Sequence, residues 1–178
     1  MQASSIAPLR LVFLMWLFFT VEYYLHMDLG FMGIYPRSVT GMLGILTSPM
    51  IHGNFNHLLS NTIPLLALGG SLYFFYPSVA SRVFLHAYFF TNILVWTFGR
   101  PFYHIGASGL VYSLAAFLVF YGFFHRNFKS VIISLVVVIV YGGLVFGVLP
   151  SNQGVSWESH LMGSLVGGVS AFLFGYKK

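Results

Sequence analysis

The stretch HIGASGLVYSLAAFLVFYGFFH, residues 104–125, contains no Asp, Glu, Lys or Arg, and the next charged side chain is Arg126. Its apolar part, together with its flanks, approaches the roughly 20 residues that an α-helix needs to cross the hydrocarbon core of a bilayer. This helix would begin at Gly106-Ala107-Ser108-Gly109, where a serine stands between glycines although lipid is expected to surround it. The stretch therefore predicts a membrane-spanning helix whose polar first turn needs an explanation from the rest of the sequence.

Five other runs in the sequence have the same apolar character. They are residues 11–24, 58–75, 83–98, 131–149 and 161–176. Only 6% of the 178 residues are charged and 58% are hydrophobic, whereas about a quarter of the residues in a soluble domain are charged. The strands of a membrane barrel would instead appear as alternating segments of about ten residues. We therefore expect an all-α membrane protein, a polytopic bundle of six transmembrane helices forming a single domain over residues 1–178.

The positive charges predict how such a bundle is oriented. With a cytoplasmic N-terminus, only Arg37 and Arg100 would lie outside, and the cytoplasmic side would hold Arg10, Arg82, Arg126, Lys129, Lys177 and Lys178. This distribution fits the positive-inside rule. The net charge of +5 is then explained by topology and by anionic lipid headgroups. Because the sequence contains no compact basic stripe, we expect the lipid bilayer and not nucleic acid as its surroundings.

Cysteine content and the first and longest segments narrow the possibilities further. The chain has no cysteine, which excludes disulfides, thiolate metal sites and a cysteine nucleophile. No small-residue cleavage site follows the first apolar run, so we expect this run to be kept as a helix and not removed as a signal peptide. The link over residues 25–50 mixes glycine and proline with apolar residues, and we expect it to lie in the outer membrane surface.

Three polar residues on three different helices are predicted to lie at one depth. Measured from the cytoplasmic ends of their helices, Ser108 lies about 27 Å up, His160 about 26 Å and Asn61 about 24 Å, at a rise of 1.5 Å per residue. Because the hydrocarbon core is about 30 Å thick, this layer lies a few ångströms below its outer boundary. A lone serine in a membrane usually bonds to its own helix or to a neighbouring one, and a lone His or Asn near a helix end is usually solvated at the interface or bonded between helices. Three such residues at one depth instead favour a site inside the bundle.

Small residues indicate which helices approach each other closely. They recur every four positions in the last run, at Gly163, Gly167, Ala171 and Gly175. Packing alone explains these glycines, but it does not explain why His160 lies on the same helical face as Gly163. Gly109 similarly removes side-chain bulk beside Ser108, where the serine must meet a partner.

Four segments together resemble the rhomboid intramembrane serine proteases. They are HGNFNHLLSN (52–61), LGG (68–70), GASG (106–109) with Tyr112 four residues after the serine, and HLMGSLVGG (160–168). The resemblance runs from the second to the sixth predicted helix in the family's order. It implies the basic six-helix bacterial form, integral and multi-pass in the bacterial cytoplasmic (inner) membrane with both termini cytoplasmic. It also implies transmembrane protein substrates, cleaved in or near their membrane-spanning segments.

By position, the resemblance implies a Ser-His dyad in which Ser108 is the nucleophile and His160 the general base, with no acidic third member. A neutral imidazole suits this role because it removes the proton that makes a serine hydroxyl a poor nucleophile. The side chains of His57 and Asn61 and the backbone N–H groups of Ser108 and Ala107 would hold the oxyanion. No cofactor and no metal is implied.

The resemblance also implies supporting residues around the dyad. Tyr112 would lie against the ring of His160, His52 would brace the external loop, and the glycines Gly106, Gly109 and Gly163 would allow close approach. The chain departs from the family pattern in the external loop, where Leu43-Gly44 stands in place of the commonly seen Trp-Arg pair. The anchoring of that loop therefore needs another explanation.

Glu158 and Glu22 have no role in this scheme. Glu158 lies two positions before His160, about 200° around the helix, so it cannot orient that ring, and we expect it at a solvated helix start. Glu22, in the first predicted helix, is either a relay group or an interfacial residue. The sequence predicts neither the natural substrate nor the oligomeric state.

Two other functions stay open on the sequence alone. One is a catalytically inactive rhomboid-like protein that binds or escorts membrane helices, although such a protein is expected to lack Ser108 or His160. The other is a small transporter or channel that uses the polar layer as its binding site. The shallow position of that layer, the lack of acidic residues in the second to fifth predicted helices and the lack of an inverted repeat count against it.

Overall fold

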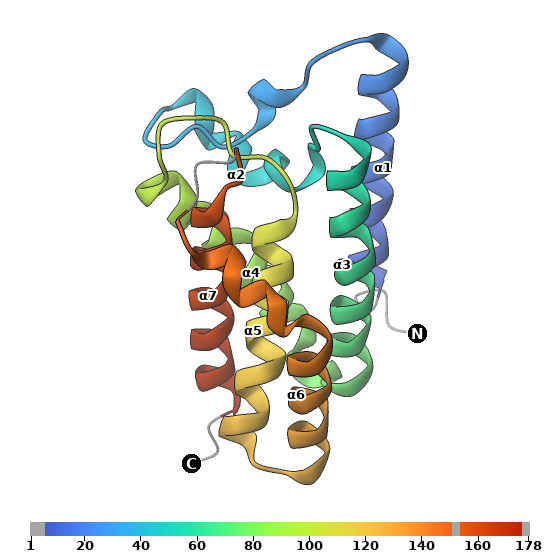
Figure 1. Ribbon diagram of the computed structural model, residues 1–178, viewed down its shortest axis with the longest axis vertical. Coiled ribbons are helices and arrows are strands. Elements are labelled where there is room, and N and C mark those ends of the chain that lie inside the picture. Colours follow the sequence, from blue (N-terminus) through green and yellow to red (C-terminus); the bar gives the residue numbers. More distant parts are fainter. Residues whose placement is uncertain (1–5, 151–153, 176–178) are drawn as a thin grey trace.

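The structure is a computed structural model that describes residues 6–150 and 154–175. Long helices lie side by side along the long axis of the molecule (Figure 1). They are α1 (Ala7–Leu25), α3 (Phe55–Phe75), α4 (Pro77–Phe98), α5 (Ser108–His125), α6 (Phe128–Tyr141) and α7 (Trp157–Gly175). A short helix, α2 (Gly44–Thr47), belongs to the link between α1 and α3. Each long helix covers all or most of one predicted apolar run, so the all-α membrane bundle is confirmed.

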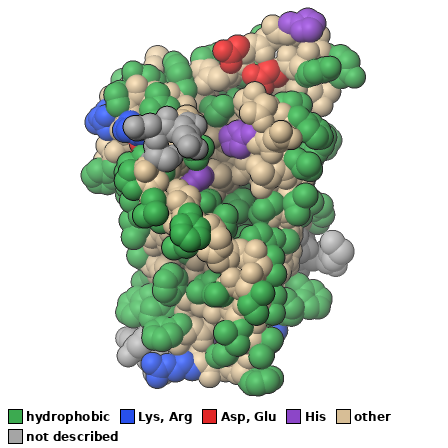
Figure 2. Space-filling model, viewed as in Figure 1, with side chains coloured by type: hydrophobic (Ala, Val, Ile, Leu, Met, Phe, Trp, Pro, Cys, Tyr) green, Lys and Arg blue, Asp and Glu red, His purple; other side chains and the backbone are tan. Residues whose placement is uncertain are grey.

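Five segments of the described chain are long and apolar enough to cross a membrane: α1, α3, α4, α5, and α6 with the turn that follows it. α7 is not among them because its first turn carries Glu158 and His160 and its later turns carry several glycines, yet it packs along α4 and α5. Hydrophobic side chains dominate the face of the molecule in Figure 2, with Lys and Arg side chains near its two ends. This distribution suits a bundle surrounded by lipid.

The fifth apolar run, residues 131–149, is not one continuous α-helix. α6 ends at Tyr141, and the chain continues as a tighter 3-10 turn over Gly142–Val148. Two successive glycines, Gly142 and Gly143, have poor helix propensity, which explains the change of geometry. The turn contacts α7, and it carries Gly147 to the first turn of that helix.

α5 is the central helix of the bundle. It contacts α3, α4, α6 and α7, and its side chains are buried around much of the helix, including Leu114, Phe117 and Leu118. α1 packs on α3, where Trp16 Nε1–H donates a hydrogen bond of 3.1 Å to Thr62 Oγ1. Because α5 is held from several sides, Ser108, its first residue, has a well-defined place relative to the other helices.

Glycines bring the backbones of α5 and α7 together. A side chain at Gly163 would overlap the carbonyl oxygen of Gly109, and a side chain at Gly167 would overlap that of Ser113. Without Cβ atoms at these two positions, the helices approach until backbone touches backbone, as in other small-residue interfaces of membrane helices. The close approach therefore extends over at least one full turn of each helix.

The link over residues 26–54 is anchored on one face of α4. Side chains spaced four residues apart along that helix reach carbonyl oxygens of the link. Tyr88 donates a hydrogen bond to Leu46 O, Asn92 to Ile45 O at 3.0 Å, and Trp96 to Ser38 O at 2.9 Å. Because residues four apart lie on one helical face, these bonds form a row along α4.

Arg37 and Gly44 complete this anchoring from the side of the link. Arg37 Nη1 donates to the carbonyl oxygens of Gly99, at 2.8 Å, and Thr97, at 3.2 Å. Gly44 is buried, and a side chain there would overlap the backbone of Gly33. The Leu43-Gly44 pair is therefore compatible with a firmly held link, because glycine lets two parts of the link touch and α4 supplies the hydrogen bonds.

Substituting Gly163 by alanine should destabilise the bundle by about 1–3 kcal/mol, because the added methyl group must push α5 away from α7. Thermal unfolding in detergent would measure the effect. Gly70→Ala in α3 is the matched control, since a Cβ at Gly70 meets no atom within 4 Å. The control should be neutral or stabilising by about 0.4–1 kcal/mol. Equal unfolding temperatures for the two variants would contradict the close contact between α5 and α7.

Candidate active site

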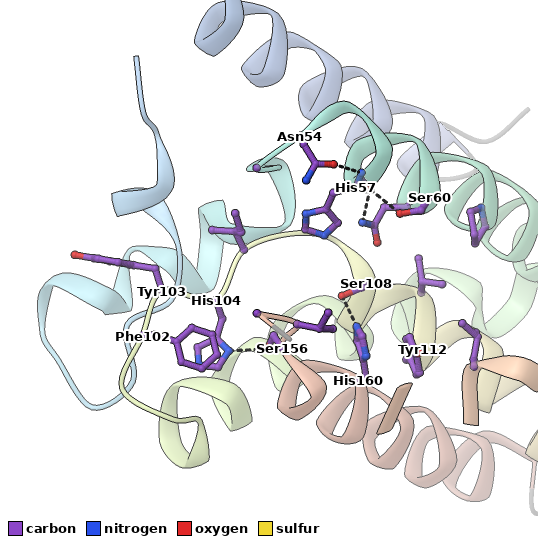
Figure 3. Close-up of a pocket in the computed structure, with 18 residues that line it drawn as sticks. Asn54, His57, Ser60, Phe102, Tyr103, His104, Ser108, Tyr112, Ser156 and His160 are labelled. Carbon is purple, nitrogen blue, oxygen red and sulfur yellow. Dashed lines mark hydrogen bonds between the residues drawn. The ribbon is translucent and has the colours of Figure 1, made fainter. Parts of the chain in front are cut away.

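A polar cavity opens at one end of the bundle, where α3, α5 and α7 begin. Its volume is about 590 Å³, and its wall includes the polar side chains of His57, Ser60, Asn61, Ser108 and His160. Figure 3 shows Ser108 between His57, which comes from α3, and His160, which comes from α7. None of the described residues that line the cavity is acidic. The structure thus brings together the three residues that were predicted to share one depth.

Ser108 and His160 lie within hydrogen-bonding distance of each other. The hydroxyl oxygen of Ser108 is 2.9 Å from Nε2 of His160, and the other ring nitrogen, Nδ1, is 2.9 Å from the carbonyl oxygen of Gly147. A carbonyl oxygen only accepts hydrogen bonds, so we assign the ring proton to Nδ1. In this tautomer, Nε2 carries the free lone pair and accepts a hydrogen bond from the serine hydroxyl.

Tyr112 and Gly147 hold the imidazole ring of His160 between them. The ring of Tyr112 stacks on that of His160 with centroids 4.1 Å apart and planes only 2° from parallel. A Cβ on Gly147 would overlap the Tyr112 hydroxyl and lie 3.2 Å from His160 Nδ1, so the turn passes this close only because residue 147 is glycine. Sequence reasoning missed Gly147, whose only signal was a glycine within an otherwise apolar run.

His57 lies against the turn that precedes Ser108. Its backbone N–H is capped by the Asn54 side chain at 2.8 Å, which places it in the first turn of α3. A Cβ on Gly106 would lie 2.5 Å from His57 Nε2, and Gly106 has φ +99°, a conformation that L side chains rarely adopt. Gly106 is therefore needed both for the turn and for the space that the His57 ring occupies.

Asn61 lies one turn further along α3 and is 3% exposed. Its Nδ2 donates a hydrogen bond of 2.8 Å to the carbonyl oxygen of His57, so one amide proton is engaged within the helix. A primary amide carries two such protons, and the second is available to a group in the cavity. On the other side of Ser108, a Cβ on Gly109 would lie 3.0 Å from the carbonyl oxygen of Ser159 in α7.

His52 is buried behind His57 and is 1% exposed. The two rings meet edge to face with centroids 4.9 Å apart, and His52 Nδ1 is 3.3 Å from the carbonyl oxygen of Met50 in the external link. Burial, assisted by the neighbouring His57, lowers the pKa of His52 from 6.5 to about 4. His52 therefore joins the end of the link to the wall of the cavity as a neutral group.

Glu158 is not at a solvated helix start, and that expectation was wrong. It is 3% exposed, and its carboxylate pairs with the guanidinium of Arg100 in the link between α4 and α5. The prediction failed because spacing within one helix gives no information about a partner that comes from a distant part of the chain. Glu22 likewise has a partner, since its Oε1 accepts the backbone N–H of Leu29 at 2.9 Å.

The unfolding temperature of the protein should fall as the pH falls from about 6.5 to about 4, because His52 binds a proton in the unfolded chain over this range but stays neutral when folded. The loss in unfolding free energy approaches about 3 kcal/mol at the low end of the range. Thermal unfolding at pH 7.5 and 4.5 would measure it, and His52→Gln, which lacks this titration, should lose less. An equal loss in both proteins would argue against a buried neutral His52.

Comparisons with known proteins identify the family to which the chain belongs. Residues 39–177 match the family described as Rhomboid domain. An uncharacterized protein of Mycobacterium tuberculosis is 37% identical over 158 residues, which cover 79% of this chain and 62% of the relative. An uncharacterized protein of Mycobacterium leprae is 37% identical over 147 residues, which cover 73% of this chain and 55% of the relative. The chain thus spans less than two thirds of the length of these relatives. It belongs to the rhomboid family, which is known for intramembrane serine proteases.

Proposed function

We propose that this protein is an intramembrane serine protease that hydrolyses peptide bonds in or near transmembrane segments, with Ser108 as nucleophile and His160 as general base. The observation that carries the proposal is the 2.9 Å contact between Ser108 Oγ and His160 Nε2, with Nδ1 engaged by Gly147 O. These contacts leave the lone pair of Nε2 directed at the serine hydroxyl. Membership of the rhomboid family supports the same reaction class.

The reaction follows from this arrangement. His160 Nε2 takes the hydroxyl proton as Ser108 Oγ attacks the carbonyl carbon of the scissile peptide, and the imidazolium then gives the proton to the leaving amine. Water, activated by the same nitrogen, attacks the acyl-enzyme and releases the second product. The carbonyl oxygen of Gly147 holds the ring throughout and stabilises the imidazolium, a role for which other serine proteases use a carboxylate.

The oxyanion of the tetrahedral intermediate would be held by donors on two helices. His57 and Asn61 supply side-chain N–H groups from α3, and Ser108 and Ala107 supply backbone N–H groups from the start of α5, where a helix leaves its first N–H groups unpaired. In a low-dielectric site each donor is worth a few kcal/mol of transition-state stabilisation, about 10²–10³ in rate. His57 and Asn61 provide this without bringing a full charge into the membrane.

The substrate is then a membrane protein that enters from the bilayer. A helix hides its carbonyl groups in its own hydrogen bonds, so the cleaved segment must unwind, most readily near its outer end. We place the cavity at the outer side of a bacterial cytoplasmic membrane with both termini cytoplasmic. In support, the turn between α5 and α6, with Arg126, and the start of α6, with Lys129, lie at the end of the bundle away from the 26–54 link (Figure 1). Residues 1–178 act as one domain in this proposal.

The structure gives less support to the alternatives. An inactive helix-binding protein has no need for a serine and a histidine in mutual contact with the ring held in one tautomer. A transporter with a proton relay would use an acidic residue inside the bundle. Glu22 and Asp28 instead accept backbone hydrogen bonds at the end of α1 and just after it, and Glu158 is paired with Arg100.

Cleavage of a single-span model substrate in liposomes should be abolished in Ser108→Ala and in His160→Ala, because neither variant can form the acyl-enzyme at a useful rate. The control is Ser113→Ala, which removes a buried hydroxyl from α5 that lies one turn further along and outside the cavity. Purified protein of each variant would be compared at equal thermal stability. Cleavage that persists in Ser108→Ala would refute the mechanism.

Asn61→Ala should lower kcat about a hundredfold with little change in KM, because the lost donor acts on the oxyanion and not on the bound substrate. Steady-state kinetics on the same substrate would separate the two constants. Ser60→Ala provides the comparison, since Ser60 also lines the cavity but its hydroxyl donates to His57 O within its own helix. A larger effect at Ser60 than at Asn61 would place the oxyanion elsewhere.

A further inference from the structure

Arg100 and Glu158 tie together the two segments that lead into the site. Arg100 belongs to the link before α5, and Glu158 to the first turn of α7. Arg100 Nε donates to Glu158 Oε1, and Nη2 donates to Oε2 at 3.2 Å. Such a two-point contact fixes the orientation of two groups as well as their distance. No other ion pair is present within residues 6–150 and 154–175.

The two partners differ in their contact with solvent. The Glu158 side chain is 4% exposed, whereas that of Arg100 is 40% exposed. A buried carboxylate without a positively charged partner is strongly destabilising. The pair therefore holds the first turn of α7 and the link before α5 to each other. The Arg100 guanidinium also lies over the rings of Phe102 and Trp157, 5.0 and 5.7 Å from their centroids, which restricts it to one orientation.

A second connection runs beside the first through neutral groups. His104 Nε2–H donates to the carbonyl oxygen of Arg100 at 3.0 Å, so Nδ1 is the acceptor, and the Ser156 hydroxyl donates to it at 2.6 Å. The Ser156 oxygen lies 2.6 Å from the hydroxyl of Ser159 in α7. Burial lowers the pKa of His104, which keeps the ring neutral. Figure 3 shows the bond between His104 and Ser156 beside the cavity.

Both connections act on short stretches of backbone next to the reacting groups. The backbone of His104 exchanges two hydrogen bonds with Ile34, at 2.8 and 2.9 Å, which fixes the link just before it turns into α5 at Ser108. On the other side, Glu158 is in the same helical turn as His160. We call the contacts of Arg100 with Glu158 and of His104 with Ser156 the junction. A displacement at the junction would therefore directly change the distance between Ser108 and His160.

We infer that Arg100 and Glu158, with His104 and Ser156, are positioning residues that hold Ser108 at reaction distance from His160. This inference rests on the proposed function. Glu158 does not touch the reacting atoms, because it lies about 200° around α7 from His160. It acts through the backbone of the first turn of α7, while the glycine contacts hold the rest of that helix against α5.

A merely stabilising role makes a different prediction. If the ion pair only stabilised the fold, a variant that lacks it would have a lower unfolding temperature and an activity reduced only as far as its folding is. A displacement of reacting groups by about 1 Å costs about a hundredfold in rate even when its source is remote. Positioning therefore predicts a change in kcat that exceeds any change in stability.

Glu158→Gln tests this directly, because the neutral amide loses the ion pair and leaves Arg100 in contact with water. Its matched control is Glu22→Gln, which removes a carboxylate that bonds to the backbone at the end of α1. We expect kcat to fall about tenfold to a hundredfold in Glu158→Gln, with KM and unfolding temperature close to those of the control. The fall in kcat should be smaller in Arg100→Lys than in Glu158→Gln, because lysine keeps the positive charge but cannot make the two-point contact. An unchanged kcat in Glu158→Gln overturns the inference.

The distance between two spin labels tests the geometry of the junction independently of activity. The chain has no cysteine, so Tyr103→Cys and Val155→Cys introduce two spin-label sites on either side of the junction without other changes. Both residues are close to half exposed. Adding Glu158→Gln should broaden the distribution of distances between the labels, and adding Glu22→Gln should not. A fall in kcat without broadening overturns the inference, because positioning must be visible as geometry.

The two measurements also separate this inference from the proposed function. If the unaltered chain shows no cleavage that depends on Ser108, the proposed function fails and kcat gives no information about the junction. The label distances then decide alone: broadening in Glu158→Gln supports the positioning of Ser108 and His160, and an unchanged distribution overturns it.

Discussion

The contact on which the rest of this structure depends is backbone against backbone between α5 and α7. Lipid tails are as apolar as leucine, so the hydrophobic effect does not press helices together inside a membrane, and close packing must do so. At Gly163 and Gly167 no Cβ atom stands between the helices. Ser108 and His160 lie in the first turns of α5 and α7. Their side chains are close enough for a hydrogen bond only because these two helices touch. Larger side chains at the two glycines would separate the Ser108 hydroxyl from the His160 ring.

Close packing creates a second requirement, because every polar group drawn into the bundle needs a partner. Around the cavity this requirement is met at the first turns of helices, where backbone N–H groups lack helical partners and the chain connects to loops. Asn54 caps α3, Asn61 donates to a carbonyl of its own helix, and both ring nitrogens of His160 have partners. The cavity therefore lies at one end of the bundle, where polar groups are supported and loops cover it.

Much of this arrangement could be predicted from the sequence, because a helix converts spacing into depth. Ser108, Asn61 and His160 were expected in one layer, and the structure brings them to one cavity. Contacts between distant segments could not be predicted in this way. Nothing in the sequence around Gly147 indicates that its carbonyl meets His160, and Glu158 reads as a solvated charge until Arg100 is seen beside it. The end of α6 at Tyr141 was also missed, since an apolar run hides a change from α to 3-10 geometry.

The position of the acidic residue follows from the cost of charge in a membrane. A carboxylate in contact with the His160 ring would have to be desolvated without a cation beside it, and such an unpaired buried charge costs several kcal/mol. The Gly147 carbonyl sets the same tautomer without adding a charge. Glu158 instead lies at the start of α7, where Arg100 reaches it from a side that is partly open to water. Neutral groups thus contact Ser108 and His160, and the ion pair lies further out, where Arg100 is partly exposed to water. There the cost of the charge is smaller, and the pair still holds the two segments that carry the serine and the histidine.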